Sequence, residues 1–206
     1  MDTGVYTHTS VYTHIAKSFT RSRNSVWDIV KTFLDQAKSN STLLDVGCGG
    51  GQNMLYRTDL QATGIDICPE FITICKEKKL NVIEGNILNI PFPNDYFDSV
   101  ICIAVVHHLK THEERLQAIN ELIRVTKGRL LFSLWKEMRY SPNATKGVIT
   151  KLNNEGDYLI PWSINGQILQ RFYHFITDVE LEEIKTLYPN IKIINSYGNL
   201  FFWYDK

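Results

Sequence analysis

The chain has 206 residues, and 44% of them are hydrophobic, which is enough to bury the core of one globular domain over residues 1–206. Its 22 basic and 22 acidic residues give a formal net charge of zero. This balance argues against broad, non-specific nucleic-acid binding but leaves room for a local basic patch that grips one folded RNA. The N-terminus lacks the apolar run of a signal peptide, and no apolar run is long enough to span a membrane. We therefore expect a cytosolic protein without a membrane segment.

The cysteines show neither a metal-binding nor a disulfide pattern. None forms a C-x-x-C pair, and no histidine lies beside them at the spacing of a metal site. We expect them to be small buried hydrophobic residues in a reducing compartment, and we expect no metal site. The four are Cys48, Cys68, Cys75 and Cys102.

The first two thirds of the chain alternate between predicted helices and strands. A helix is expected over residues 24–37, with Asn24 as its cap and with Val30, Phe33 and Leu34 on one face. The alternation that follows from residue 42 to residue 135 predicts βαβ units and a parallel sheet. Strands are expected at residues 42–47, 62–66, 80–85, 97–106 and 128–135, and helices at residues 51–58, 69–79 and 114–125.

Two capping boxes predict later helix starts, one at Thr111 and Glu114 and one at Thr177 and Glu180. Residues 136–176 carry Pro, Gly and Asn without a clear period, which in a compact α/β domain indicates a substrate lid. Two closing strands are expected at residues 191–198 and 199–205. The predicted parts are N-terminal helices (1–40), a cofactor-binding core (41–135), the lid (136–176), and a closing helix with strands (177–206).

The segment "LLDVGCGGGQN" at residues 43–53 is a strand that runs into a glycine-rich turn. Ligands of open parallel sheets bind at the carboxyl ends of the strands, so this turn is the expected cofactor site. Its glycines, Gly47, Gly49 and Gly51, are spaced G-x-G-x-G. The dinucleotide fingerprint requires G-x-G-x-x-G, and Gln52 stands in its last position, which points away from NAD.

Acidic and amide side chains around the turn indicate which cofactor it holds. Asp45 precedes the first glycine by two residues, where a carboxylate suits an ammonium group better than a pyrophosphate; S-adenosylmethionine has an ammonium and no phosphate. Asp66 ends the second strand, where it can accept from both ribose hydroxyls of either cofactor. Asn86 can accept from the adenine amino group, with Ile87 packed on the ring. The full predicted cofactor-binding set is Asp45, Gly47, Gly49, Gly51, Asp66, Ile67, Asn86, Ile87 and Ile103.

"LLDVGCGGGQN", "GID", "EGNIL" and "FDSVICIAVVHHL" follow one another in an order and spacing that resemble class I S-adenosylmethionine-dependent methyltransferases. The resemblance covers roughly residues 40–135. It implies an α/β fold with a Rossmann-like, mostly parallel sheet of seven strands, together with N-terminal helices and a short lid insertion.

A narrower resemblance runs over most of the chain. "VYTHIAKSFTRSRNSVW", "IAVVHHLKTHEERLQAINELIRV", "LLFSLW", "YLIPW" and "RFYHFITDVELEEI" resemble the tRNA wobble-uridine carboxymethyl methyltransferases, including the methyltransferase half of the AlkB-type tRNA enzyme. This resemblance implies methyl-ester formation on 5-carboxymethyluridine at position 34, in the anticodon loop of a tRNA. It also implies a heterodimer with a small zinc-binding activator protein. In the family's usual strand order the strand at residues 80–85 lies at the sheet edge, so we expect the activator near Val82 and Ile83.

The chain departs from the family pattern at several positions. Family members usually carry Asp where this chain has Arg21, and Asp where it has Asn86. Their Pro-Gly-Gly after the fourth helix is reduced to "KGR", and the lid is short. Because Asn86 keeps an acceptor oxygen, adenine binding is expected to survive, whereas Arg21 bears on the choice of substrate.

The resemblance also fixes what the catalytic residues must do. A carboxylate nucleophile is already ionised at pH 7, so we expect no general base, only alignment for in-line displacement. Arginines are expected to hold this carboxylate, and aromatic side chains to stack on a splayed wobble base; Trp162, Tyr173 and His174 in or near the lid are further candidates. The predicted catalytic residues are His107, His108, Arg23, Arg171 and Trp135.

Two other functions fit the same turn. A methyltransferase acting on a small metabolite uses the same glycine motif. A catalytically silent methyltransferase-fold partner protein also keeps it, and the changes at Arg21 and Asn86 are compatible with that role.

Overall fold

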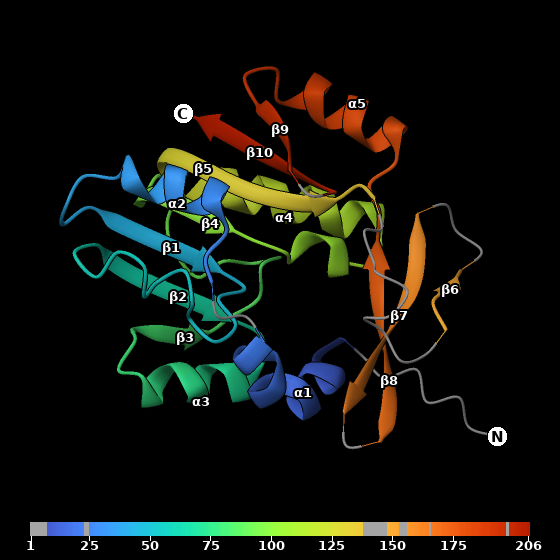
Figure 1. Ribbon diagram of the computed structural model, residues 1–206. Coiled ribbons are helices and arrows are strands. Elements are labelled where there is room, and N and C mark those ends of the chain that lie inside the picture. The colour runs from blue at the N-terminus through green and yellow to red at the C-terminus, as the bar shows by residue number, and fades with distance from the viewer. Residues whose placement is uncertain (1–7, 23–24, 138–147, 153–155, 165, 197) are drawn as a thin grey trace.

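The computed structural model describes residues 8–22, 25–137, 148–152, 156–164, 166–196 and 198–206 (Figure 1). Arg23 and Asn24, a predicted catalytic residue and a predicted helix cap, lie outside these ranges. No helix in these ranges is both long enough and apolar enough to cross a bilayer.

A seven-stranded sheet forms the centre of the molecule, in the order β3-β2-β1-β4-β5-β10-β9 (Figure 1). Neighbours from β3 to β5 pair in parallel, and β10 is antiparallel to both β5 and β9. The mostly parallel α/β fold predicted from the sequence is therefore confirmed. The strands are β1 (Thr42–Val46), β2 (Gln61–Asp66), β3 (Val82–Glu84), β4 (Phe97–Cys102), β5 (Thr126–Trp135), β9 (Lys192–Ser196) and β10 (Asn199–Asp205).

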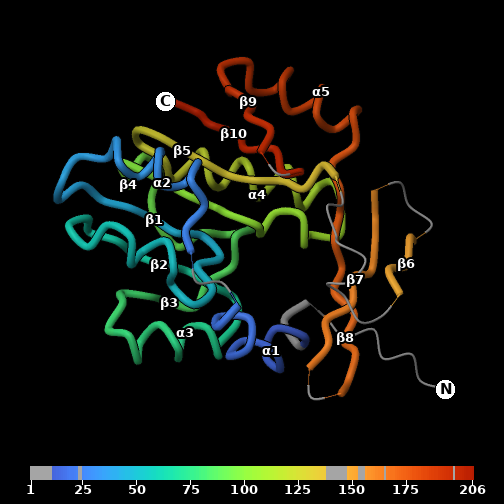
Figure 2. The backbone as a smooth tube through the Cα atoms, viewed as in Figure 1, coloured from blue at the N-terminus to red at the C-terminus, as the bar shows by residue number. Residues whose placement is uncertain are grey.

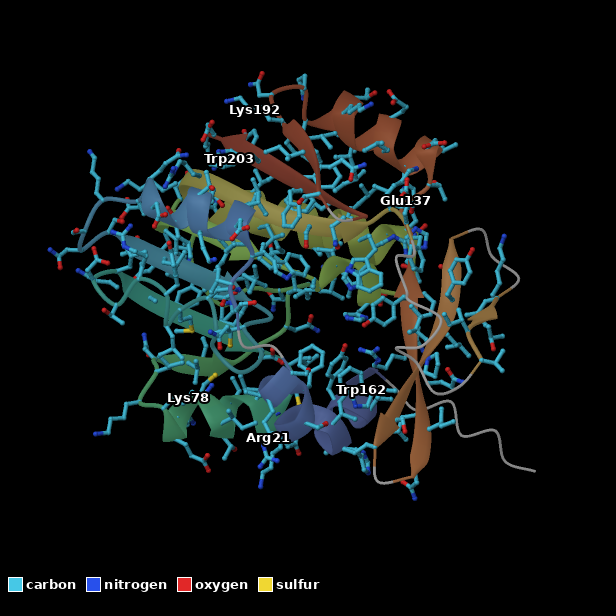
Figure 3. The ribbon with its side chains drawn as sticks, in the orientation of Figure 1. Arg21, Lys78, Glu137, Trp162, Lys192 and Trp203 are labelled. Atoms are coloured by element: carbon cyan, nitrogen blue, oxygen red, sulfur yellow. The ribbon has the colours of Figure 1, made fainter. Side chains whose placement is uncertain are left out.

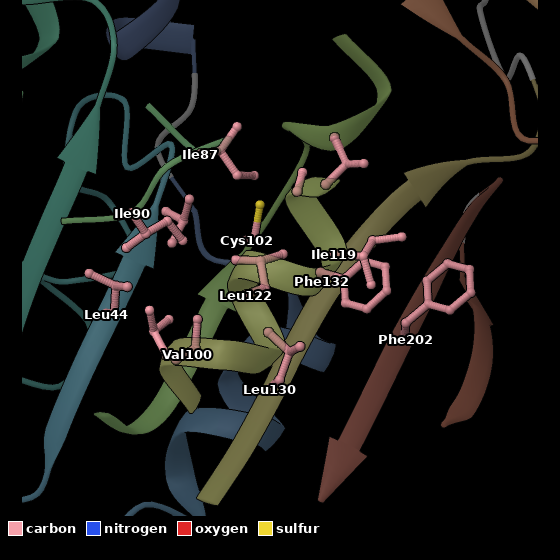
Figure 4. Close-up of a cluster of buried hydrophobic side chains, with 14 of the residues drawn as sticks. Leu44, Ile87, Ile90, Val100, Cys102, Ile119, Leu122, Leu130, Phe132 and Phe202 are labelled. Carbon is pink, nitrogen blue, oxygen red and sulfur yellow. The ribbon is translucent and has the colours of Figure 1, made fainter. Parts of the chain in front are cut away.

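Both faces of this sheet are buried, because successive residues of a strand point to opposite sides. One face carries Leu44, Val100 and Phe202 and packs on α4 (His112–Val125) and α5 (Asp178–Leu187), as Figure 4 shows for part of this cluster. The other face carries Leu43, Ile101, Leu131 and Phe201 and packs on α2 (Asp28–Asp35). The continuous apolar runs in the sequence are explained by this two-sided burial.

The two predicted capping boxes are present. Thr111 accepts from the backbone of Glu114 at the start of α4, and the Glu114 side chain accepts from the backbone of Thr111. Thr177 and Glu180 form the same reciprocal pair at the start of α5. Each box satisfies backbone donors that the helix itself leaves unpaired.

Three local predictions were wrong. Residues 51–58 form turns, because the positive φ of Gly47, Gly49 and Gly51 keeps redirecting the chain and Met54 turns into a small core. The helix expected from Asn24 begins only at Asp28, with Trp27 at its N-cap position. The strand expected at residues 97–106 ends at Cys102, since the chain adopts φ +60 at Ala104 and then forms the short helix η1 (Val106–His108).

The predicted lid is not irregular in its described part. It forms a second, antiparallel sheet in the order β6-β7-β8, made of β6 (Thr150–Lys151), β7 (Asp157–Ile164) and β8 (Gln167–His174). The alternation of buried and open positions in β8 has the period of a strand. Pro161 lies in β7 beyond the residues that pair with β6, so its missing N–H costs no bond on that edge.

The first helix, α1 (His8–Ser22), lies beside α3 (Pro69–Glu77) and β8, as the backbone trace in Figure 2 shows. Val11, Ile15 and Ala16 are buried there against Phe71 of α3 and Leu169 of β8. This packing places α1 across the carboxyl ends of the central strands.

Candidate functional site

A cavity of about 410 Å³ opens at the carboxyl ends of β1, β2 and β4, within the size range of small-molecule sites. One end lies at the glycine turn, and the other end lies at the His107–His108 pair and Tyr173. Ten of the predicted site residues line it: Gly47, Gly49, Asp66, Ile67, Asn86, Ile87, Ile103, His107, His108 and Trp135.

The glycine turn leaves β1 with a backbone that a side chain would obstruct. Gly47 has φ +69, and a Cβ atom there would lie 2.3 Å from Cγ2 of Val105. Its N–H donates to the carbonyl of Ile65 at 2.8 Å, which holds the turn against β2. Glycine at position 47 is therefore required by both conformation and space.

Asp45 lies in β1, two residues before this turn, and is buried with 1% of its surface exposed, so it is not among the described residues that line the cavity. Its Oδ2 accepts from Nδ2 of Asn53 at 3.4 Å, and within the described part of the chain no donor reaches Oδ1. Burial is the main cause that raises the pKa of Asp45 to about 7, with the Asn53 hydrogen bond opposing it. A buried carboxylate with an unsatisfied oxygen matches a cationic group better than an anionic one.

Asp66 lies at the end of β2 and lines the cavity. Its Oδ2 accepts from the N–H of Gly49 and its Oδ1 from the N–H of Cys68, each at 2.9 Å. Burial raises the pKa of Asp66, and these backbone donors counteract the rise. Each oxygen retains a lone pair, so the two bonds aim the carboxylate without excluding hydroxyl donors from a ligand.

Asn86 begins the loop after β3, where its Oδ1 accepts from the N–H of Leu88 at 2.9 Å. The oxygen predicted to accept from adenine is thus shared with its own loop, a side-chain turn typical of asparagine. Ile87 is buried beside it, and Ile103 of the segment after β4 also lines the cavity. These residues form a largely apolar slot.

Aromatic rings close the other end of the cavity. His107 stacks on Tyr173 with ring centroids 5.1 Å apart and an interplanar angle of 16°. Trp135 at the end of β5 lies 5.3 Å from His107 and 4.9 Å from Tyr173, again between centroids. His108 meets Tyr173 edge-on at 4.5 Å. The predicted residues His107, His108 and Trp135 are therefore brought together, with Tyr173 as their common neighbour.

Arg171, predicted to hold a substrate carboxylate, is not among the described residues that line the cavity. It is buried behind Tyr173, whose hydroxyl accepts from Nη1 of Arg171 at 2.8 Å. Its guanidinium lies 4.7 Å from the ring centre of Trp162, which projects toward α1 in Figure 3. Arg171 thus supports an aromatic wall, and Trp162 packs behind that wall. Arg21 of α1 is exposed and points away from the sheet (Figure 3).

His174 also lies outside the cavity wall, in a buried charged network. Its Nδ1 is 2.7 Å from Oδ1 of Asp157, and its Nε2 is 2.7 Å from Oε2 of Glu180. Nη2 of Arg115 donates to the other oxygen of Glu180 at 2.6 Å. The network joins β7 and β8 to α4 and α5, which makes His174 a structural anchor of the second sheet.

Several cavity residues were missed by sequence reasoning. Tyr12, Phe19 and Thr20 of α1 line the cavity, and so does Lys110 in the loop before α4. The helical spacing of apolar residues in "VYTHIAKSF" predicts a buried helix face but not the ligand beside it. No group of three or more metal-binding side chains occurs in the part of the chain that the structure describes.

Comparison with known families shows what this part of the chain is similar to. Residues 44–132 match a family model described as a methyltransferase domain. This segment is therefore similar to methyltransferase domains. The chain shares its fold with the solved structure of SAM-dependent methyltransferases from Methanosarcina mazei, with a TM-score of 0.67 at 19% identity, over 88% of this chain and 98% of that one.

Two curated relatives extend the similarity beyond this domain. The tRNA (carboxymethyluridine(34)-5-O)-methyltransferase alkbh8 of Xenopus tropicalis is 27% identical over 96% of this chain, which spans only 40% of that protein. The tRNA (carboxymethyluridine(34)-5-O)-methyltransferase of Schizosaccharomyces pombe is 29% identical over 87% of this chain and 86% of its own length.

A further solved structure is the Haloferax volcanii methyltransferase in complex with the Trm112 methyltransferase activator. It matches with a TM-score of 0.53 at 18% identity, over 65% of this chain and 63% of that one.

The described residues fit the cofactor in its charge requirements. The methionine portion of S-adenosylmethionine carries an ammonium group, and Asp45 offers a buried carboxylate oxygen that takes no hydrogen bond from the described residues. Asp66 presents a fixed carboxylate to the cavity, and the apolar slot around Ile87 has the character that an adenine ring needs.

Proposed function

We propose that this protein transfers a methyl group from S-adenosylmethionine to the carboxylate of 5-carboxymethyluridine at the wobble position of a tRNA, forming the methyl ester. The observation that carries the proposal is the Schizosaccharomyces pombe relative, which aligns over 87% of this chain and 86% of its own length. The proposed cofactor contacts are Asp45 to the ammonium, Asp66 to the ribose hydroxyls, and Asn86 with Ile87 to the adenine.

The proposed chemistry needs alignment more than proton transfer. The bound cofactor supplies an electrophilic methyl group on a cationic sulfur. The nucleophile is an anion at neutral pH, so no side chain has to remove a proton. The protein excludes water and holds the uracil against the wall formed by His107, Trp135 and Tyr173. Positioning of this kind supplies roughly 7–11 kcal/mol of a barrier.

We further propose that Arg171 contributes by fixing Tyr173, and that Arg23 contacts the substrate carboxylate or a phosphate. The support for the first role is the 2.8 Å bond between Nη1 of Arg171 and the Tyr173 hydroxyl. Arg23 keeps its assignment from the sequence alone. Lys110 is a cation at the cavity wall. Replacing Lys110 is therefore the control that shows whether loss of any nearby positive charge weakens substrate binding.

A transfer assay tests this function. Purified protein, tritiated S-adenosylmethionine and the activator are incubated with tRNA whose position 34 is either 5-carboxymethyluridine or uridine. We expect label only in the first tRNA, and alkaline hydrolysis should release it as methanol, as an ester requires. Label entering only the small molecules of a metabolite extract would contradict the proposal, and so would the absence of any transfer.

We also propose that a small zinc-binding activator docks along β3. This strand is the sheet edge, and Ile83 exposes 37% of its surface there, so an added strand can pair with it. Val82, the other predicted docking residue, is buried against Ile72 and Cys75 and is not available to a partner side chain. The docking surface is therefore the β3 backbone with Ile83 and Glu84.

Replacing the exposed edge residue tests this docking. We expect Ile83→Asp to prevent copurification with the co-expressed activator. The isolated variant should keep its melting temperature, because the side chain of Ile83 is exposed and its replacement leaves the core intact. Leu187→Asp on α5 is the matched control, since Leu187 is similarly exposed, at 51%, but far along the sheet from β3. Undiminished copurification of Ile83→Asp would exclude β3 as the docking edge.

A further inference from the structure

Tyr12 of α1 reaches across the cavity to the histidine pair. The side chain is 94% buried, being 6% exposed, and its hydroxyl lies 3.1 Å from Nε2 of His108. The Tyr12 ring also packs edge-on against Phe19, with centroids 5.4 Å apart. Helix α1 therefore contributes a hydrogen-bonding group to the substrate end of the cavity.

The other nitrogen of His108 defines the direction of this hydrogen bond. Nδ1 lies 3.0 Å from the backbone carbonyl oxygen of Phe172 in β8. A carbonyl only accepts, so Nδ1 carries the proton, and in the neutral ring Nε2 accepts from the Tyr12 hydroxyl. His108 is thus a bridge between α1 and β8, with both ring nitrogens engaged inside the protein.

Fixing His108 also fixes the residue beside it. His107 and His108 belong to the same short helix η1, and their ring centroids are 4.4 Å apart. His107 in turn stacks on Tyr173, the residue of β8 that follows the bridged carbonyl. The wall that faces the substrate is therefore one packed unit, and Tyr12 holds it from the side of α1.

The opposite end of α1 rests on the cofactor turn. A Cβ atom on Gly50 would lie 2.5 Å from Cγ2 of Thr20, so the helix and the turn are in close contact. Thr20 and Tyr12 are separated by eight residues, or about 12 Å of helix. One helix thus touches both the turn that holds the cofactor and the histidine that faces the substrate.

We propose that Tyr12 is a positioning residue for methyl transfer, which acts by holding His108, and through it His107 and Tyr173, in the geometry that receives the substrate. This inference rests on the proposed function for its kinetic meaning. The hydroxyl group of Tyr12 carries the effect, while its ring serves packing.

Tyr12→Phe removes the hydroxyl and keeps the ring. We expect kcat to fall about three- to ten-fold, as for the loss of one hydrogen bond, with KM for tRNA and the affinity for cofactor changed less than about two-fold. Tyr56→Phe is the matched control, because it removes a hydroxyl bonded to Asp35 at 3.1 Å on an exposed surface, and it should leave kcat unchanged.

A double-mutant cycle decides whether Tyr12 acts through His108. His108→Phe keeps a ring beside Tyr173 and deletes both nitrogens, and adding Tyr12→Phe to it should cost no further activity. Additive losses would overturn the inference, and so would a Tyr12→Phe variant that matches Tyr56→Phe in kcat.

Imidazole nitrogen NMR reads the bridge without any substrate. We expect His108 of the wild-type protein to be the Nδ1–H tautomer, and its Nε2 resonance to shift in Tyr12→Phe, while the resonances of the histidines outside η1 stay unchanged. An unchanged His108 spectrum would refute the bridge. A wild-type protein that shows the bridge but does not methylate the tRNA would instead refute the proposed function.

Discussion

Burial destabilises the charged form of Asp45 in the proposed cofactor site. Its folded-state pKa of about 7 lies above its ordinary value because burial disfavours the charge. Below the unfolded-state pKa the carboxyl is neutral in both the folded and the unfolded chain, so its burial does not reduce stability. As pH rises from about 4 to 7 the unfolded chain ionises first, and the free energy of unfolding declines. The total loss is roughly 4 kcal/mol. A bound ammonium offsets this cost, since it pairs with the ionised form.

Asp45→Asn separates these two effects. We expect the ligand-free variant to melt at a higher temperature than wild type at pH 8 and at a similar temperature at pH 4. Cofactor affinity should fall at least ten-fold at pH 8, because a charge-assisted hydrogen bond is lost. In the wild type, affinity should weaken about ten-fold per pH unit below pH 7, and Asp45→Asn should show no such slope.

Calorimetric titration and thermal melts across this pH range measure both effects. Asp98→Asn is the matched control, since Asp98 is also a strand carboxylate but accepts from Thr42 at the opposite end of β1 and β4. Undiminished cofactor affinity in Asp45→Asn would rule out the assigned role.

At the scale of elements, the second sheet is fastened to the core by Glu180. Burial alone would raise the pKa of Glu180, but hydrogen bonds from His174, the Thr177 backbone and Arg115 bring it well below its ordinary value. A depressed pKa means stability that is present above the unfolded-state pKa, near 4.5, and that is lost as pH falls below it.

Glu180→Gln should destabilise the protein by roughly 3 kcal/mol at pH 7, because Arg115 and His174 lose a buried anionic partner. The difference from wild type should begin to shrink as pH falls below 4.5, because Glu180 of the unfolded chain becomes protonated there while Glu180 of the folded protein stays ionised. Urea unfolding at pH 7 and pH 4 measures this. Glu182→Gln, which affects only an exposed pair with Lys185, should change stability by less than about 0.5 kcal/mol. Equal effects of the two substitutions would contradict the account.

The elements also show what the sequence can and cannot predict. Strands buried on both faces, the capping boxes and the glycine turn are local patterns, and the structure contains them where they were expected. The sequence did not predict the β7–β8 hairpin. Pro161 interrupts the strand pattern of β7, and neither β7 nor β8 has a clear strand pattern until the two are paired. The residues after Gly51 have the composition of a helix but form turns. Only the positive φ angles of the preceding glycines exclude a helix there, and these cannot be read from composition.

At the scale of the whole molecule, the site is built by segments far apart in the chain. Sequence patterns placed Asp66 and Asn86 on the correct strand ends, because parallel strands share one edge. The contribution of Tyr12 and the withdrawal of Arg171 behind Tyr173 depend on where α1 and β8 pack, which no local pattern encodes. The substrate end is therefore the part that sequence alone described least well.

The same arrangement gives each layer a separate task. The central sheet presents the glycine turn, α1 lines the cavity with Tyr12, Phe19 and Thr20, and the second sheet lines it with Tyr173. Proposed substrate recognition thus lies in elements added to a methyltransferase-like fold, while the proposed cofactor contacts lie within it.

Nucleoside mass spectrometry of wobble uridines, in cells with and without this gene, tests the proposed reaction most directly. We predict that cells lacking the gene lose the methyl ester of 5-carboxymethyluridine and accumulate the free acid or its amide, and that the Asp45→Asn variant fails to restore the ester. Unchanged levels of the ester in those cells would contradict it.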